Sequence, residues 1–345
     1  MTAREQSTSP KVTLGDVAIA ANVSPAAASL ALRGRRGVSD ATRERIIETA
    51  NEMGYRSRSA IARAENLVVG VLLKAKREAL VDVDAFYGPV LAGITTEAST
   101  AGVELRLDSL LVDDDFDPVE VPRSVQSDDV DGLLVLGTHL TERSQSMIAP
   151  NPVVLVDGYA DSPWSFSSVV ANNKAGTQAA TQHLIDLGHR RIAMVGTRPD
   201  SFPSIVERRL GYESAMVNAR LDPVFIDSDH DESELAAEQF MVEFERQPGL
   251  SAVVAANDDV AISLMRSLGS EVPNRISVVG FDDITAASLI RPRLTTVTVD
   301  KPALGRLALS LVTHRIRHPE DPPVTAMVPA VLTIRESSVA PPPGY

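Results

Sequence analysis

The fold of the first part of the chain is decided by residues 13–32, TLGDVAIAANVSPAAASLAL. Thr13 is a good N-cap residue and Asp16 follows three residues later, a variant of the capping box that predicts a helix start. Apolar side chains then recur at helical spacing until a three-residue break. Ser24 predicts a second start, with Pro25 at the first helical position, where a missing N–H costs nothing. The stretch therefore predicts two short helices joined by a tight turn, as in a helix-turn-helix unit.

A third helix is predicted from Ser39 to Gly54. Small side chains on the first two helices would let their backbones approach closely; these are Ala18, Ala21, Ala27 and Ala28. A plain bundle of three helices is the alternative interpretation of this pattern.

The charge of the chain is divided unevenly along its length. The net charge is −13, but residues 1–64 contain ten Lys and Arg against six acids, which leaves −17 for the rest. A basic segment attached to an acidic body indicates a nucleic-acid contact at one end. A chance cluster of arginines is the other explanation.

From Leu67 onward, short β-branched runs alternate with helical patterns, which predicts parallel sheets built from βαβ units. Strands are expected at 67–73, 103–111, 132–136, 153–156, 192–195, 252–255, 277–279 and 327–335. Helices are expected at 88–101, 175–187, 206–219, 232–247, 258–268 and 301–317. Two runs of alternation with one return predict two similar lobes. No Gly-x-Gly-x-x-Gly follows the first strand, which argues against a dinucleotide-binding enzyme.

Polar side chains follow several of these strands. Asp157, Asn257 and Asp282 each come directly after a strand, where ligands bind in such sheets. Together with Arg208, these groups could hold the hydroxyls of a ligand. The neighbouring Asp258 and Asp283 are expected to cap helices instead. Phe86 and Tyr87 could stack on a flat or sugar-like face.

Several motifs together resemble the lactose-repressor (LacI/GalR) family of transcriptional regulators. They are VTLGDVA (12–18), ATQHLIDLGHRRI (180–192), SVVGFDD (277–283), RLTTV (293–297) and RESS (335–338). The resemblance runs from Val12 to about Pro341. It implies an all-α helix-turn-helix head and an α/β body like the periplasmic binding proteins, with two Rossmann-like lobes.

The resemblance implies that the second helix lies in the major groove of DNA. Residues of this helix and of the segments around it are expected to contact bases and phosphates. They are Thr13, Ser24, Pro25, Ala26, Ser29, Leu30, Arg33, Arg35, Arg36, Arg56, Arg58 and Ile61. Relatives usually carry polar side chains where this chain has Pro25, Ala26 and Leu30. Those three could contact thymine methyl groups, or they could only pack and leave specificity to phosphate contacts and DNA shape.

In the family, the hinge after the head inserts a leucine into the minor groove. That position falls at Ala64 here, and Ile61 is the sizeable apolar residue nearby. Residues 56–65 are therefore either a hinge helix with Ile61 as its wedge or a flexible basic linker.

The resemblance also implies an effector, often a sugar, between the lobes. The expected contacts are Phe86, Tyr87, Thr138, Asp157, Arg208, His230, Asn257 and Asp282. Gly158 departs from the polar residue usual there, and His230 stands where relatives often carry an aromatic wall.

Other functional classes are not indicated. The chain has no cysteine, and its six histidines lack the spacing of a metal site, so we expect no cofactor and no metal. The acidic run from Asp113 to Asp117 lacks the spacing of a calcium loop and is expected to be a solvated loop. With no signal peptide and no apolar run of membrane length, a cytoplasmic location without membrane contact is expected.

The sequence thus predicts a repressor that binds a pseudo-palindromic operator as a homodimer under the control of a small molecule. It is not expected to be an enzyme. The alternative is a small-molecule (sugar) binding protein without specific DNA recognition. The expected boundaries are a disordered tail (1–11), the head (12–55), the hinge (56–65), an N-lobe (66–159 and 292–323), a C-lobe (160–291 and 324–337) and a second disordered tail (338–345).

Overall fold

A computed structural model describes residues 13–32, 38–53, 67–75, 85–122, 130–148, 151–162, 165–247 and 249–343. The chain divides into two compact units, Met1–Leu67 and Val68–Tyr345, which we call the head and the body. The hinge expected at 56–65 and the tail expected at 1–11 lie outside the described residues.

The head contains the three predicted helices: α1 (Leu14–Ala20), α2 (Pro25–Leu32) and α3 (Asp40–Glu52). Thr13 and Asp16 form a full capping box, since each side chain accepts a hydrogen bond from the other residue's backbone N–H. Ser24 Oγ accepts from the backbone N–H of Ala27 at 3.1 Å and so caps α2. The core consists of small and branched side chains: Val17, Ala18, Ala21, Ala28, Ala31, Ile46 and Ala50.

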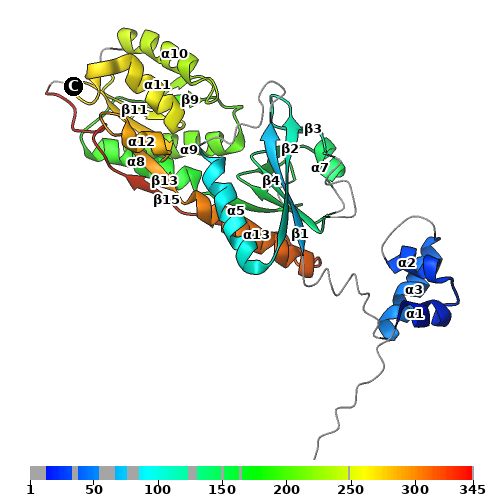
Figure 1. Ribbon diagram of the computed structural model, residues 1–345. Coiled ribbons are helices and arrows are strands. Elements are labelled where there is room, and N and C mark those ends of the chain that lie inside the picture. The colour runs from blue at the N-terminus through cyan, green and yellow to red at the C-terminus, as the bar shows by residue number, and fades with distance from the viewer. Residues whose placement is uncertain are drawn as a thin grey trace, which may run out of the picture. The chain divides into compact units, whose positions relative to one another are not determined.

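The first lobe of the body, the N-lobe, is built on a seven-stranded sheet with the order β14-β8-β6-β4-β1-β2-β3. All neighbours are parallel except β2 and β3. Its strands are β1 (Val68–Ala75), β2 (Glu104–Val112), β3 (Pro118–Glu120), β4 (Gly132–Leu136), β6 (Val153–Val156), β8 (Ser167–Ala171) and β14 (Thr325–Val328). Helices α5 (Tyr87–Ala101) and α13 (Lys301–Arg317) lie side by side on one face (Figure 1). The short α7 (Glu142–Ile148) packs into the core of the opposite face.

The second lobe, the C-lobe, has a six-stranded sheet with the order β10-β9-β11-β12-β13-β15, in which only β15 is antiparallel to its neighbour. Its strands are β9 (Ile192–Thr197), β10 (Val224–Asp227), β11 (Ala252–Ala255), β12 (Ser277–Asp282), β13 (Thr295–Val299) and β15 (Ala330–Thr333). Its helices are α8 (Asn173–Asp186), α9 (Pro203–Asn218), α10 (Ser233–Arg246), α11 (Asp258–Leu268), α12 (Thr285–Leu289) and the short η1 (Gly269–Glu271). α8 and α9 lie on one side of the sheet, and α10 and α11 lie on the other (Figure 1).

The lobe boundaries differ from those expected at 159/160, 291/292 and 323/324. β8 pairs with β6 in the N-lobe sheet, and β14 pairs with β8, although both were assigned to the C-lobe. β13 pairs with β12 in the C-lobe sheet, although it was assigned to the N-lobe. The chain therefore crosses between β8 and α8, between β13 and α13, and between β14 and β15. The predicted strand 327–335 is in fact two strands, one in each lobe.

A third, two-stranded sheet joins β5 (His139–Leu140) to β7 (Tyr159–Ala160) beside the N-lobe strands that precede them.

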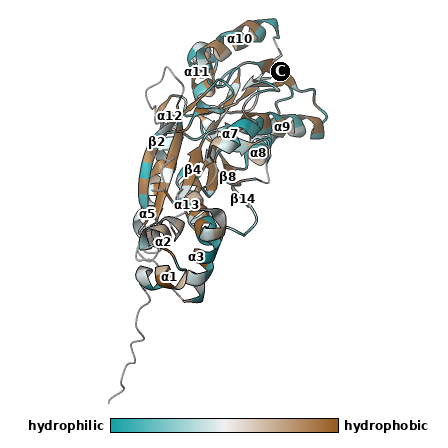
Figure 2. Ribbon diagram, turned by 90° about the vertical axis from the view of Figure 1, so that its right-hand side faces the viewer, coloured by the Kyte–Doolittle hydropathy of each residue, from teal (hydrophilic) through white to brown (hydrophobic). Residues whose placement is uncertain are grey.

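Parallel strands buried on both faces should be almost wholly apolar. β4 and β6 are buried at every position, and Figure 2 shows β4 in the brown of apolar residues. None of the helices in the described residues combines the length and the apolar character that crossing a bilayer requires.

The C-terminal segment is held in place as far as the structure describes it, which corrects the disordered tail expected at 338–345. Ser338 is buried and its hydroxyl lies 2.9 Å from that of Thr295. The backbone N–H of Val339 donates to Ser277 Oγ, and its carbonyl oxygen lies 2.8 Å from His189 Nε2. Polar side chains of the C-lobe thus replace the water that a free tail would bind.

Candidate functional site

A cavity of about 530 Å³ lies between the two lobes of the body. The N-lobe contributes Lys74, Ala75, Ala85, Phe86, Tyr87, Phe116 and Asp157. The C-lobe contributes Phe202, Ser204, Ile205, Arg208, His230, Asp231, Ser233, Asn257, Asp259, Asp282 and Ile284. The carboxyl ends of both parallel sheets point to this cavity, which is the position at which such sheets bind ligands.

Seven of the eight predicted effector contacts line this cavity: Phe86, Tyr87, Asp157, Arg208, His230, Asn257 and Asp282. Thr138 is not among the lining residues, and its side chain is completely buried. The chain turns at Gly137, whose φ is 69°, and the Thr138 carbonyl then accepts a hydrogen bond from the backbone of Tyr159. Thr138 is therefore part of the N-lobe interior rather than of the cavity wall.

Arg208 and Asp282 form a buried ion pair on the C-lobe side. An Arg208 Nη donates to Asp282 Oδ1 at 3.0 Å, and the guanidinium also donates to the Ala256 carbonyl and to Asn173 Oδ1. It stacks on the ring of Phe281 at 3.8 Å. These partners offset the desolvation of both charges and fix the orientation of the pair. The pair can present oxygen and nitrogen atoms to a polar ligand without rearranging.

Asp157 faces the cavity from the end of β6. It is 7% exposed, and its Oδ2 accepts a hydrogen bond from the Tyr87 hydroxyl at 3.0 Å. Its Oδ1 has no hydrogen-bond partner among the described residues. Burial raises the pKa of Asp157 to about 6, although the charge of Arg208 acts in the opposite direction. A buried acceptor without a partner is expensive, so Oδ1 is suited to accept from a ligand.

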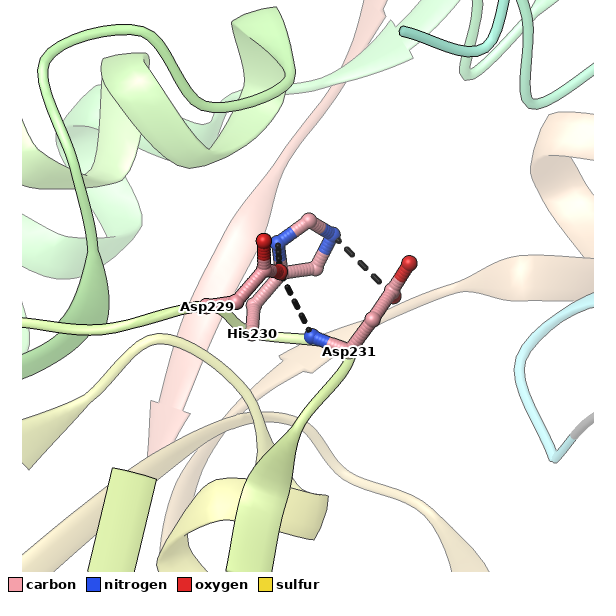
Figure 3. A group of neighbouring side chains, drawn as sticks. All are labelled: Asp229, His230 and Asp231. Atoms are coloured by element: carbon pink, nitrogen blue, oxygen red, sulfur yellow. Dashed lines mark hydrogen bonds and ion pairs between the residues drawn. The ribbon is translucent and has the colours of Figure 1, made fainter. Parts of the chain in front are cut away.

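His230 lies between two carboxylates in the loop before α10 (Figure 3). Its Nδ1 is 3.3 Å from Asp229 and its Nε2 is 3.3 Å from Asp231. Hydrogen bonding from His230 holds the pKa of Asp229 far below its usual range. Within the described ranges, these three residues are the group whose ligand atoms lie close enough for one metal ion. The two carboxylates meet opposite nitrogens of the ring, however, so the arrangement braces the imidazole rather than converging on one point (Figure 3).

Asn257 has a double role at the start of α11. Its Oδ1 accepts from the backbone N–H of Val260 and so caps the helix, while its Nδ2 donates to the His230 carbonyl. The prediction that Asp258 and Asp283 cap helices is wrong. Asp258 accepts from Thr296 and from the backbone N–H of Ile284, and Asp283 pairs with Arg335 and Thr298. Both acids join separate segments of the C-lobe.

Two aromatic residues of the cavity, Phe116 and Phe202, were not among the predicted effector contacts. Their ring centroids are 5.1 Å apart across the two lobes. Phe116 lies in the acidic run expected to be solvated, yet it is 7% exposed, and Asp117 beside it is 6% exposed. Asp117 accepts from the backbone and hydroxyl of Thr141. For Phe116, the signal available in the sequence was an aromatic residue inside a run of four acids.

Comparison with known proteins agrees with this architecture. Residues 13–57 match the model for bacterial regulatory proteins of the lacI family, and residues 181–338 match a periplasmic binding protein-like domain. The transcriptional repressor PurR of Vibrio atlanticus is 30% identical over 322 residues, which cover 88% of this chain and 92% of the relative. The chain belongs to the lacI family of bacterial regulatory proteins.

Other lacI-family proteins cover similar lengths. The ribose operon repressor of Escherichia coli K12 is 30% identical, over 89% of this chain and 94% of that protein. A solved CelR–cellobiose complex is 28% identical, with a TM-score of 0.65 and coverage of 95% and 100%. The names of these relatives describe transcriptional repressors and regulators. The chain is accordingly a DNA-binding transcriptional regulator with an effector-binding body.

The head of this lacI-family protein carries the predicted DNA contacts, of which three are fully described. Thr13, Ser24 and Pro25 are exposed around the starts of α1 and α2. The side chains of Ala26, Ser29 and Leu30 lie outside the described part of the chain, as do Arg33, Arg35, Arg36, Arg56, Arg58 and Ile61.

Proposed function

We propose that this lacI-family regulator is a repressor whose operator affinity is set by a small molecule bound between the lobes. The cavity carries this proposal, because seven effector contacts predicted from sequence meet there. A ligand that touches both lobes can favour one lobe arrangement over another, and only such a difference in affinity can shift a conformational equilibrium. The head, residues 12–55, would bind DNA, with residues 56–65 as the hinge. As a DNA-binding protein it would act in the cytoplasm.

We propose a sugar as the effector. Asp157, Asn257 and Asp282 supply the acceptors and donors that sugar hydroxyls need, and Phe86 can pack on the apolar face of a sugar ring. The names of two relatives support this class, since CelR was solved with cellobiose and another relative is a ribose operon repressor. The cavity would bind and release the sugar without chemical change.

The regulator would act as a homodimer on a pseudo-palindromic operator, since a twofold protein matches a twofold site. A groove on the C-lobe supports self-association. It lies between α11 and α12 and includes Ile262, Met265 and Ile290. Leu289 lines the same groove and is 70% exposed, so it adds apolar surface that a second copy of the chain could cover.

The DNA-binding part of the proposal is tested by comparing the full chain with a chain that lacks residues 1–66. Binding to operator and to random duplex is measured across a salt series. The full chain should bind with an affinity that falls steeply with salt, because phosphate contacts release counterions. The shortened chain should show no such binding. Equal behaviour of the two proteins would refute the proposal.

The effector part is tested by thermal shift with a panel of sugars. The substitution Asp157→Asn keeps the shape of the side chain but alters its acceptor, so it should abolish or sharply reduce any shift. Glu238→Gln is the matched control, because Glu238 is exposed on α10 and does not line the cavity. A shift that both variants retain would argue against the assigned site.

A further inference from the structure

The cavity concentrates the aromatic residues of a chain that has few. Phe, Tyr and Trp make up only 4% of the sequence, yet four of them line the cavity. Three surround the ammonium group of Lys74, whose Nζ lies 4.4 Å from the ring centroid of Phe116, 5.6 Å from that of Tyr87 and 5.8 Å from that of Phe202. These distances fall within the ~6 Å range of cation–π attraction. We call Tyr87, Phe116 and Phe202 the aromatic cage.

Backbone features hold the aromatic cage in position. Phe116 has a φ of 62°, a left-handed conformation that is unfavourable for a bulky residue. The backbone N–H of Asp117 donates to Asp113 Oδ1, which tightens the turn around it. Gly137 leaves room for the side chains of Tyr87 and Lys74, since a Cβ at this position would lie 2.3 Å from the Tyr87 hydroxyl and 3.0 Å from Lys74 Cδ. Unfavourable backbone kept by surrounding contacts is typical of functional sites.

The electrostatics of the cavity favour a cation. Its lining contains four carboxylates, which are Asp157, Asp231, Asp259 and Asp282, against the cationic side chains of Lys74 and Arg208. Arg208 is already paired with Asp282. The charge of Lys74 lowers the pKa of Asp157, against the larger effect of burial, so the ammonium and this carboxyl group interact. Phosphate or carboxylate groups would meet net repulsion here, whereas an organic ammonium would be attracted.

We propose that the aromatic cage is a cation-binding subsite of the effector cavity, filled by the Lys74 ammonium in the absence of effector. The effector would then be a hydroxylated organic amine, such as an amino sugar, whose ammonium group replaces that of Lys74. Phe202 belongs to the C-lobe and the other two rings to the N-lobe, so the bound cation contacts both lobes. This inference rests on the proposed function, because it treats the cavity as the effector site.

The test uses tetramethylammonium as the probe and isothermal titration as the readout, with sodium chloride as the ionic control. Lys74→Ala empties the aromatic cage, so this variant should bind the probe saturably. The wild type should bind it about tenfold more weakly, because its own lysine competes. Lys74→Met is the matched control, since its uncharged side chain still fills the space and should prevent binding. Adding Phe116→Ala to Lys74→Ala should weaken binding by about tenfold, because the closest ring is lost.

The proposal is overturned if Lys74→Ala shows no saturable binding, or if the double variant binds equally well. A second measurement covers the case in which Lys74→Ala does not fold. In the wild-type protein the ε-methylene proton signals of Lys74 should be shifted upfield by the surrounding rings, and Phe116→Leu should reduce the shift. Unshifted signals in the wild type would also overturn the proposal. Neither readout involves DNA, so failure here is distinguishable from failure of operator binding.

Discussion

At the scale of a single residue, Asp157 combines three features that are unfavourable in the folded state. Its backbone has a positive φ of 46°, its side chain is buried, and one of its two oxygens lacks a hydrogen-bond partner among the described residues. The positive φ strains the backbone, while the burial and the missing partner disfavour an ionised carboxylate in the folded state. A ligand that donates a hydrogen bond to Oδ1 removes part of that cost. Under the proposed function, this relief would contribute to the affinity for the effector.

The titration of Asp157 predicts a pH dependence of stability. Its pKa is about 6 in the folded protein against 3.8 for an ordinary carboxyl group. Between pH 3.8 and about 6, Asp157 is therefore more often protonated in the folded state than in the unfolded state. The resulting stabilisation is complete below pH ~4 and is lost as the pH rises through 6, with an upper limit of about 3 kcal/mol. Asp157→Asn should flatten this part of the profile.

Urea unfolding at pH 4.5 and pH 7, followed by the fluorescence of the single tryptophan, Trp164, measures this effect. Other carboxyl groups titrate as well, so the informative quantity is the difference between wild type and variant. Glu238→Gln, an exposed acid, should leave the profile unchanged. Parallel profiles for wild type and Asp157→Asn would show that Asp157 is an ordinary carboxyl group.

Sequence reasoning located the polar residues of the cavity but not all of its aromatic ones. Asp157, Asn257 and Asp282 were found because the carboxyl ends of parallel strands meet at one edge of a sheet. Phe116 and Phe202 lie in loops, whose direction depends on contacts that no local pattern encodes. Thr138 also follows a strand, but the turn at Gly137 places it in the interior.

At the scale of elements, helix pairs in both lobes meet through glycine. A Cβ on Gly305 of α13 would lie 2.1 Å from the Val90 carbonyl oxygen of α5, and one on Gly211 of α9 would lie 2.3 Å from the Lys174 carbonyl oxygen of α8. Only a residue without a side chain permits such close approach. Both contacts involve backbone atoms, which cannot move aside as a flexible side chain can.

We predict that Gly305→Ala destabilises the N-lobe by about 1–3 kcal/mol, because overpacking outweighs the gain in helix propensity. The free energy of unfolding in urea measures the change. Ser310→Ala on the same helix is the control, because Ser310 is exposed and should tolerate the substitution. An unchanged or increased stability of Gly305→Ala would mean that α5 and α13 can separate without cost.

The limits of sequence reasoning differ between elements. The three head helices and α13 were predicted almost to the residue, because caps and helical periodicity are local signals. The sheet to which a strand belongs is not local information. β8 and β14 pair with each other although about 150 residues separate them, as in Ser168 with Thr325. Their apolar patterns fit either lobe equally well.

At the scale of the whole molecule, the last part of the chain completes both lobes. β14 is the edge strand of the N-lobe sheet, and β15 is the edge strand of the C-lobe sheet. Only one residue separates them. The following segment then fixes Ser338 and Val339 against the C-lobe. Neither lobe has its full set of strands until this short region is present.

A chain truncated after Glu320 should therefore be unstable in both lobes, because each loses an edge strand and stability margins are only about 5–15 kcal/mol. Limited proteolysis should cut it throughout the body. A chain truncated after Pro341 is the control and should resist like the wild type, since it keeps β14, β15 and the contacts of Val339. A resistant lobe in the Glu320 truncation would show that this lobe folds without its edge strand.

The three crossings between the lobes limit how effector specificity can be exchanged between relatives. A chimera with a single junction between β8 and β14 would take these two paired strands from different parents. Exchange of a whole lobe needs three junctions, between β8 and α8, between β13 and α13, and between β14 and β15. Recombination at one point between β8 and β14 thus separates paired strands, whereas point substitutions in the cavity leave these pairings intact. New specificities in this architecture should arise residue by residue.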